Sequence, residues 1–200
     1  MRWTRWTALA ASLAVAVVAV ATWSCAKPAQ NTPAPITQEQ KVARGEYLTT
    51  IMGCNDCHTP FKVGASGPEP DMSRMLSGHP ETLKLTSKPM PSGEWVWAGA
   101  GTNTAFHGPW GTTYAPNLTP DRVTGLGVWP EETFVKAMRT GRHYGVARPI
   151  LPPMPWQAVG QATNEDLKSI YAYLQSIKPI RNQVPDYEPP SPAPKSSGKS

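Results

Sequence analysis

Apolar residues near the C-terminal end of the chain recur with the period of an α-helix. The positions that share one helical face are Leu167, Ile170, Tyr171, Leu174 and Ile177. Thr163 is followed three residues later by Asp166, which resembles a capping box with aspartate in place of glutamate. Pro179 cannot continue a helix. The pattern predicts a helix that starts after Thr163 and stops before Pro179.

A second helix is predicted over residues 37–51, capped by Thr37. Its apolar face consists of Ala43, Tyr47, Leu48 and Ile51. Gly45 lies in its interior, where glycine costs about 1 kcal/mol relative to alanine. A close approach of another helix at Gly45 would explain that residue.

A shorter helix is predicted over residues 130–140. Pro130 suits its first position, Glu131 and Glu132 suit the N-terminal dipole, and Gly141 suits the C-terminal stop. Its apolar face consists of Phe134, Ala137 and Met138. The predicted fold class is therefore mainly α.

Residues 61–119 form a long Gly/Pro-rich stretch without strong periodicity. Loops of that length inside a compact domain are usually functional or wrapped around something. One short helical turn is expected within it, over residues 71–76. We expect residues 181–200, rich in Pro, Ser and Lys, to be a disordered tail.

The first 25 residues have the pattern of an export leader. Arg2 and Arg5 precede an apolar run over residues 8–21, which is too short for a confident membrane span. Cys25 follows, so residues 1–24 are predicted as a signal peptide and Cys25 as a lipidated first residue. The cleavage box of bacterial lipoproteins usually has leucine three positions before the cysteine, where this chain has Thr22. Residues 19–21 (Ala-Val-Ala) also offer an ordinary signal-peptide cleavage site. Soluble secretion and an uncleaved anchor therefore remain alternatives, and residues 26–36 are expected to be a flexible tether.

The charge balance does not indicate nucleic-acid binding. The chain has 200 residues and a formal net charge of +5. Without the two arginines of the leader, 17 basic residues face 14 acidic ones, a net of +3. No cluster of Lys and Arg and no nucleic-acid motif accompanies this small excess.

Cys54-Asn55-Asp56-Cys57-His58 has the C-x-x-C-H form that attaches haem covalently. Thiolates at i and i+3 can reach the two vinyl groups on one porphyrin edge, and the following histidine can ligate the iron. The sequence thus predicts one haem c, held by Cys54 and Cys57, with His58 as the proximal ligand.

Three other interpretations of the motif compete with haem attachment. A thioredoxin-like pair needs a βαβ setting, which the patterns do not indicate. A closed zinc site needs four ligands, and the one further cysteine lies far upstream. A structural disulfide between adjacent helical turns would be strained.

Several segments together resemble a mono-haem class I c-type cytochrome. The resemblance rests on residues 44–48, 54–58, 153–156 and 166–174. Residues 117–121, 124–127, 129, 139–142 and 153–155 are more narrowly similar to cytochrome c subunits of periplasmic membrane-bound dehydrogenases. The resemblance implies a class I cytochrome c domain over 37–180, with few helices around the haem and an insertion at about 61–119. Those subunits often hold several haem domains, whereas this chain has a single C-x-x-C-H.

The distal ligand is predicted to be Met154, in the stiff loop Leu151-Pro152-Pro153-Met154-Pro155. The resemblance puts the axial methionine in such a loop, and the alternative is that Met154 only packs beside the haem. Trp156 is expected to wall the haem or donate to a propionate. Three loop histidines are weaker alternatives for the distal position: His79, His107 and His143.

A haem with two protein ligands has no open site on iron, so a single-electron carrier is expected rather than an enzyme. The alternative is a haem peroxidase or gas-binding sensor with a displaceable sixth ligand, and a docking subunit with an incidental haem is a third possibility. The expected partners are an oxidase, a dehydrogenase or another cytochrome. The expected location is the periplasmic side of a bacterial membrane through a lipid on Cys25, or alternatively the soluble periplasm.

Overall fold

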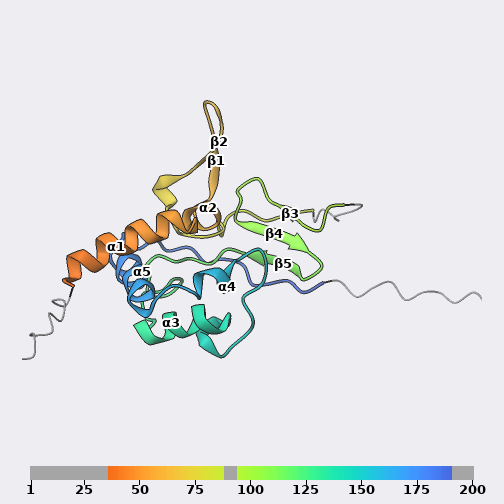
Figure 1. Cartoon of the computed structure of the whole chain (residues 1–200). Coiled ribbons are helices and arrows are strands. Elements are labelled where there is room, and N and C mark those ends of the chain that lie inside the picture. Colours follow the sequence, from red (N-terminus) through yellow and green to blue (C-terminus); the bar gives the residue numbers. More distant parts are fainter. Residues whose placement is uncertain (1–35, 88–93, 191–200) are drawn as a thin grey trace, which may run out of the picture. The chain divides into compact units, whose positions relative to one another are not determined.

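The computed structural model describes residues 36–87 and 94–190 of the chain. The predicted signal peptide, the lipidation at Cys25 and nearly all of the tether lie outside the described residues. Along the described part, two α-helices come first, short strands follow, and the remaining α-helices come last (Figure 1). No helix of the described residues is long and apolar enough to cross a membrane.

Helices α1 (Gln38–Ile51) and α5 (Asn164–Ser176) pack against each other, although more than 100 residues separate them in the chain. The Thr37 side chain and Gln40 form a reciprocal capping box at the start of α1. The Thr163 hydroxyl accepts from the Asp166 amide at the start of α5. Both helices therefore begin where the sequence predicts.

The predicted close approach at Gly45 is confirmed. A Cβ atom there would lie 1.9 Å from the Ser169 carbonyl oxygen and 2.7 Å from Cβ of Tyr173, both on α5. Arg44 beside it donates to the Asp166 carboxylate at 2.8 Å. Glycine thus lets the two helix backbones cross in direct contact.

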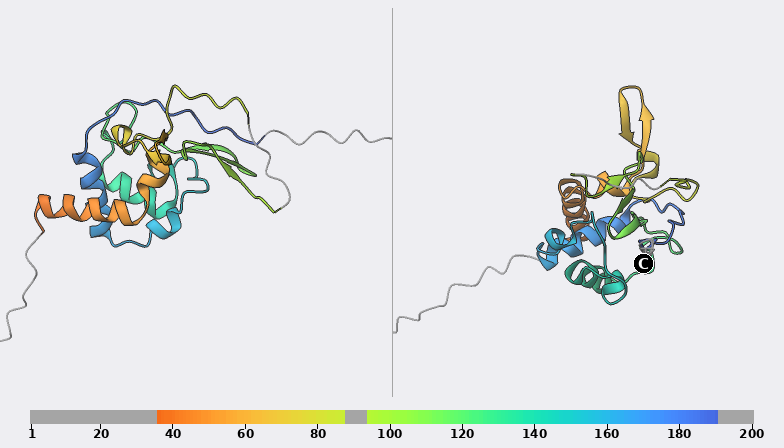
Figure 2. Two further views of the ribbon diagram at one scale, coloured as in Figure 1. Left: turned by 90° about the horizontal axis from the view of Figure 1, so that it is seen from above. Right: turned by 90° about the vertical axis from the view of Figure 1, so that its right-hand side faces the viewer.

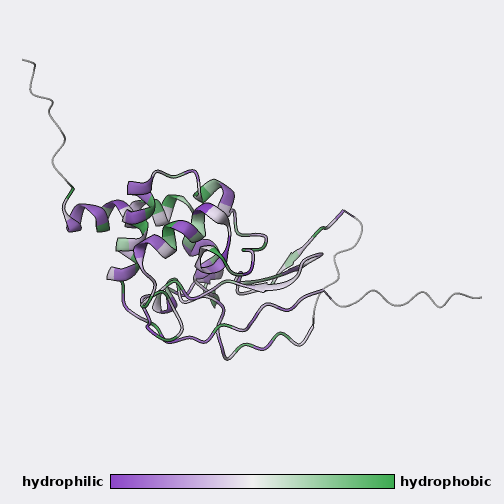
Figure 3. Ribbon diagram, turned by 90° about the horizontal axis from the view of Figure 1, so that it is seen from below, coloured by the Kyte–Doolittle hydropathy of each residue, from purple (hydrophilic) through white to green (hydrophobic). Residues whose placement is uncertain are grey.

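Helix α3 (Glu131–Thr140) packs against α5 and against the short helix α4 (Trp156–Val159). Pro130 is the N-cap residue of α3 and not its first helical residue, and Gly141 ends the helix in the left-handed conformation at φ 62°. Helices α1, α3, α4 and α5 and two loop leucines contribute to one apolar core. Its buried members are Leu48, Leu76, Leu126, Phe134, Val159, Leu167, Ile170, Tyr173 and Leu174. In Figure 3 the green, hydrophobic side of the helical ribbons faces inward toward this core.

The described residues of the Gly/Pro-rich stretch predicted as a loop insertion form five short strands. Strands β1 (Phe61–Gly64) and β2 (Gly67–Pro70) form an antiparallel hairpin that projects next to α2 (Cys54–His58) (Figures 1 and 2). Strands β3 (Ala98–Gly99), β4 (Ala105–Gly108) and β5 (Gly111–Tyr114) form an antiparallel sheet in that order. The turn expected over residues 71–76 is the 3₁₀ helix η1 (Met72–Arg74), and a second one is η2 (His143–Gly145).

The disordered tail predicted from residue 181 is wrong for residues 181–190. This segment, which we call the C-terminal strap, runs from the end of α5 to the β4–β5 hairpin (Figure 2). Thr112 and Glu188 exchange both backbone hydrogen bonds, at 2.8 and 3.0 Å. Side chains hold it as well, since Tyr114 donates to the Glu188 carboxylate and Tyr187 to the Trp110 carbonyl. Residues 191–200 lie outside the described residues.

Candidate cofactor-attachment site

Helix α2 presents the two cysteines of the motif one turn apart. Gly53, in the left-handed conformation at φ 68°, separates α2 from α1 and lets the chain change direction. Cys54 and Cys57 are free thiols, each half-buried, and Cys54 packs against the apolar core. Neither is joined in a disulfide, so both remain available for bonds to a cofactor.

The surroundings of the cysteines disfavour a thioredoxin-like redox pair. Burial raises the pKa of the Cys54 thiol to about 11 and also raises the pKa of Cys57, where the Asp56 carboxylate adds to the effect. A redox-active cysteine pair needs a lowered pKa that yields thiolate near neutral pH. In the part of the chain that the structure describes, no group of three His, Cys, Asp or Glu side chains is arranged for a metal ion. A zinc site at the motif therefore has no support among those residues.

His58 is buried and oriented by one hydrogen bond. Its Nδ1 lies 2.9 Å from the carbonyl oxygen of Pro116. A carbonyl only accepts, so Nδ1 must carry the proton and Nε2 must carry the lone pair. Burial lowers the pKa of His58 and favours this neutral form. The tautomer is the one that a metal ligand needs, since a ligating histidine commonly donates its other N–H to a carbonyl.

Further hydrogen bonds fix the motif to the next segment of the chain. The Thr59 hydroxyl donates to the Asn55 amide oxygen and accepts from the backbone amide of Leu76, both at 2.9 Å. The Asn103 side chain donates to the carbonyl of Asp56 at 2.7 Å. Leu76 and Asn103 both follow the β1–β2 hairpin in the chain, so α2 and the adjoining Thr59 are held in place by contacts with later segments.

Two free thiols one turn apart and a neutral histidine with a lone pair on Nε2 form the donor set that a covalently attached haem requires. The described residues therefore fit a haem c at Cys54, Cys57 and His58. Pro116, which orients His58, was not found from the sequence. Its contribution is a backbone carbonyl, and every residue type supplies one.

Met154 lies in the loop between η2 and α4 and packs against the same core cluster as Cys54. Its loop is tied to the sheet, because the Thr113 hydroxyl donates to the Pro152 carbonyl at 3.1 Å. Among the described residues, Met52, Met75 and Met138 also pack against this core. The structure thus brings Met154 to the core that Cys54 borders, and its ligand role stays a prediction.

Two of the three competing histidines have ring nitrogens engaged with the protein. His79 is fully buried. Its Nδ1 lies 2.9 Å from the Thr104 hydroxyl and its Nε2 lies 3.2 Å from the Leu83 carbonyl. Nδ1 of His107 lies 2.8 Å from the hydroxyl of Thr112. His79 therefore has no nitrogen left for iron.

Trp156 begins α4, and its ring packs over Gly141 at the end of α3. A Cβ atom on Gly141 would lie 2.3 Å from that ring, so the indole fits only against glycine. Trp156 thereby joins the Met154 loop to α3. Its predicted contact with haem stays a prediction.

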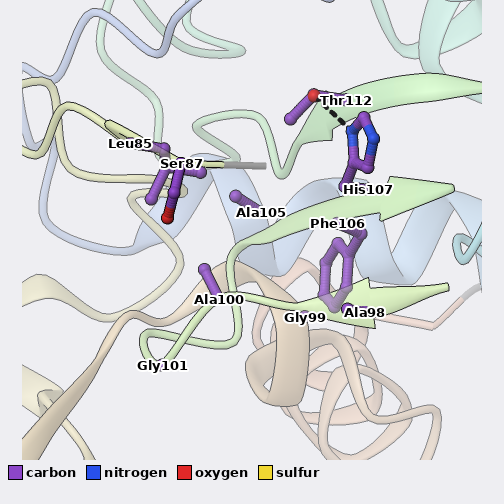
Figure 4. A pocket seen from close by; sticks show the side chains of 10 residues that line it. All are labelled: Leu85, Ser87, Ala98, Gly99, Ala100, Gly101, Ala105, Phe106, His107 and Thr112. Atoms are coloured by element: carbon purple, nitrogen blue, oxygen red, sulfur yellow. Dashed lines mark hydrogen bonds between the residues drawn. The ribbon is translucent and has the colours of Figure 1, made fainter. Parts of the chain in front are cut away.

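A cavity of about 280 Å³ lies elsewhere, beside the β3–β4–β5 sheet and residues 85 and 87 (Figure 4). Small and apolar residues dominate its lining, together with Phe106, His107 and Thr112. The lining includes none of Cys54, Cys57 and His58. We therefore place the candidate site at the motif and not at this cavity.

No family model matches the chain, but comparison with known proteins finds several cytochrome c subunits of dehydrogenases among its relatives. The chain is 29% identical to the fructose dehydrogenase cytochrome subunit of Gluconobacter japonicus over 84% of its own length and 27% of that protein. It is 35% identical to the gluconate 2-dehydrogenase cytochrome c subunit of Pantoea cypripedii, over 76% of the chain and 26% of that protein. It is 28% identical to the cytochrome c subunit of the quinone alcohol dehydrogenase of Gluconobacter oxydans, over 74% of the chain and 24% of that protein.

The chain spans about a quarter of the length of these relatives. The matched part exceeds two thirds of the chain in each of them, so it includes most of the described residues. The chain is thus a homologue of cytochrome c subunits of bacterial dehydrogenases.

Proposed function

We propose that this protein is a mono-haem c-type cytochrome that transfers single electrons. The observation that carries the proposal is the state of the C-x-x-C-H helix. Cys54 and Cys57 are free, and His58 donates through Nδ1 to Pro116, which leaves the Nε2 lone pair for iron. The relatives support this function, because their names describe cytochrome subunits of dehydrogenases. One motif of this form in the chain supports one haem.

The chain's residues would bind and orient the haem. Cys54 and Cys57 would form thioether bonds, His58 would supply the proximal ligand, and Met154 the distal ligand. Iron held by histidine and methionine supplies reversible one-electron chemistry, and a thioether ligand raises its reduction potential relative to a second histidine. Trp156 would help to keep water away from the side of the haem that Met154 faces. Because His58 and Met154 together would leave no open site on the iron, electron transfer would be favoured over substrate chemistry.

The expected partners are redox proteins: a dehydrogenase, an oxidase or another cytochrome. The export leader supports a location on the periplasmic side of a bacterial membrane. A lipid on Cys25 and a tether over residues 26–36 would keep the haem domain near membrane-bound partners and raise its effective concentration there. We expect Cys25→Ser to move the protein into the soluble fraction. If the Cys25→Ser variant stays in the membrane fraction, the protein is held there by an uncleaved anchor and not by a lipid on Cys25.

Covalent attachment is tested by denaturing mass spectrometry of the exported protein from a bacterial host that matures c-type cytochromes. We expect the parent chain to keep the mass of one haem after unfolding, and Cys54→Ser with Cys57→Ser to lose it. Cys25→Ser is the matched control, since it removes a thiol outside the motif and should retain the haem. A parent chain that releases its haem on unfolding would contradict covalent attachment.

A further inference from the structure

The side chain of Asn182, on the C-terminal strap, has hydrogen-bond partners for both its donor and its acceptor atoms. It is fully buried. Its Nδ2 donates to the carbonyls of Ser77 and His79 at 2.7 and 2.9 Å, and its Oδ1 accepts from Arg74 Nη2 and the Glu81 amide at 3.0 and 2.9 Å. An asparagine side chain has two donor hydrogens and two acceptor sites, so all four are used.

The carbonyls that Asn182 binds belong to a buried segment, residues 76–79, that lies between the motif and residues 115–118. On one side the Gly78 amide donates to the carbonyl of His58 at 2.7 Å. On the other side the His79 amide donates to the Ala115 carbonyl at 3.0 Å, and Leu76 accepts from the Leu118 amide at 2.9 Å. Segment 76–79 therefore bonds to His58 itself and to Ala115 and Leu118, which flank Pro116 in the chain.

Gly78 brings this segment into direct contact with Pro116. It has a φ of +77°, and a Cβ atom there would lie 2.6 Å from the carbonyl carbon and 2.7 Å from the carbonyl oxygen of Pro116. The Pro116 carbonyl is the group that accepts from Nδ1 of His58. A shift of Gly78 would displace that carbonyl, because the two backbones are packed without space between them.

We propose that Asn182 is a positioning residue for the proximal histidine. The strap inserts Asn182 behind segment 76–79, its two N–H groups hold that segment against residues 115–118, and the Pro116 carbonyl stays in line with Nδ1 of His58. The carbonyl bond makes the imidazole a stronger donor, and a stronger donor stabilises oxidised iron. Asn182 thereby lowers the reduction potential from a distance. This inference rests on the proposed haem attachment at His58.

The test uses Asn182→Leu, which keeps roughly the side-chain size and leaves Ser77 and His79 carbonyls without donors. Asn182→Ala is the second variant, in case the leucine variant does not fold. Both changes are uncharged, so a shift in potential does not arise from a new charge. We expect a more positive midpoint potential and faster solvent exchange of the His58 Nδ1 proton, measured by NMR on the reduced protein.

Tyr187→Phe is the matched control on the same strap, because it removes only the hydroxyl that donates to the Trp110 carbonyl at 2.6 Å. This variant should be less stable than the parent, but its midpoint potential and the exchange rate of its His58 Nδ1 proton should equal those of the parent. If the folded Asn182 variants also keep both parental values, the strap acts on stability alone and the inference is wrong. Absence of covalent haem from the parent chain would instead overturn the proposed function, so the two failures are distinguishable.

Discussion

At the scale of single residues, the proton on His58 decides what the motif can bind. The sequence identifies Cys54, Cys57 and His58 because their spacing is local. It does not identify Pro116, which lies 58 positions from His58 and contributes only a carbonyl. Backbone acceptors leave no trace in the identity of a residue, so the partner that sets the tautomer is visible only in the folded chain.

Met154→Ala tests the distal ligand. We expect the variant to keep covalent haem and to lose the ferric absorption band of methionine–iron bonding at about 695 nm, because alanine has no donor atom. Met138→Ala is the matched control, since Met138 packs on the same core from α3. It should keep the band. A parental spectrum in Met154→Ala would show that another group fills the sixth position.

His143 gives a prediction about pH. Burial, and then the nearby Arg148 charge, lower the pKa of His143 to about 4. The unfolded chain has the ordinary value of about 6.5, so between these values it binds more protons than the folded chain. The contribution of neutral His143 to stability is therefore complete above about pH 6.5 and is lost as the pH falls toward 4.

The measurement is urea unfolding of the parent and of His143→Gln between about pH 7 and about pH 4.5. Glutamine does not titrate, so the variant should lose less unfolding free energy over this range than the parent. Equal losses in both proteins would mean that His143 does not contribute to acid sensitivity.

At the scale of elements, helices were more predictable than strands. The caps Thr37 and Thr163 and the stop at Gly141 are local signals, and they place the helix ends to within a residue. Strands β1 to β5 are two to four residues long and rich in glycine, so no alternating pattern marks them. Their pairing depends on cross-strand partners and on the strap, which pairs with Thr112.

Gly45→Ala tests the α1–α5 crossing. Alanine is about 1 kcal/mol better than glycine in a helix interior. Here its methyl group would overlap the Ser169 carbonyl, and overpacking costs about 1–3 kcal/mol. Since backbone atoms of α5 must move, we expect net destabilisation, measured by thermal unfolding of the haem-bound protein.

Gly101→Ala is the control for this substitution, because a Cβ atom there meets no heavy atom within 4 Å. It should be neutral or slightly stabilising through reduced freedom of the unfolded chain. If Gly45→Ala is as stable as the parent, the helices have room to separate at the crossing.

At the scale of the whole molecule, the strap links the end of the chain to the surroundings of the motif. The sequence predicted disorder from residue 181 because Pro, Ser and Lys dominate the last 20 residues. Composition does not reveal that Asn182 replaces a backbone partner for Ser77 and His79, or that Glu188 pairs with Thr112. Long-range hydrogen bonds order a segment that has little apolar surface of its own.

The absorption spectrum of the purified ferric protein is the most direct test of the electron-carrier account. A six-coordinate iron held by His58 and Met154 should be low-spin, show the far-red methionine band, and change little when cyanide or peroxide is added at low concentration. A high-spin ferric spectrum that shifts at once on adding either ligand would reveal an accessible sixth position. That result would contradict the electron carrier and favour a peroxidase or a gas-binding sensor.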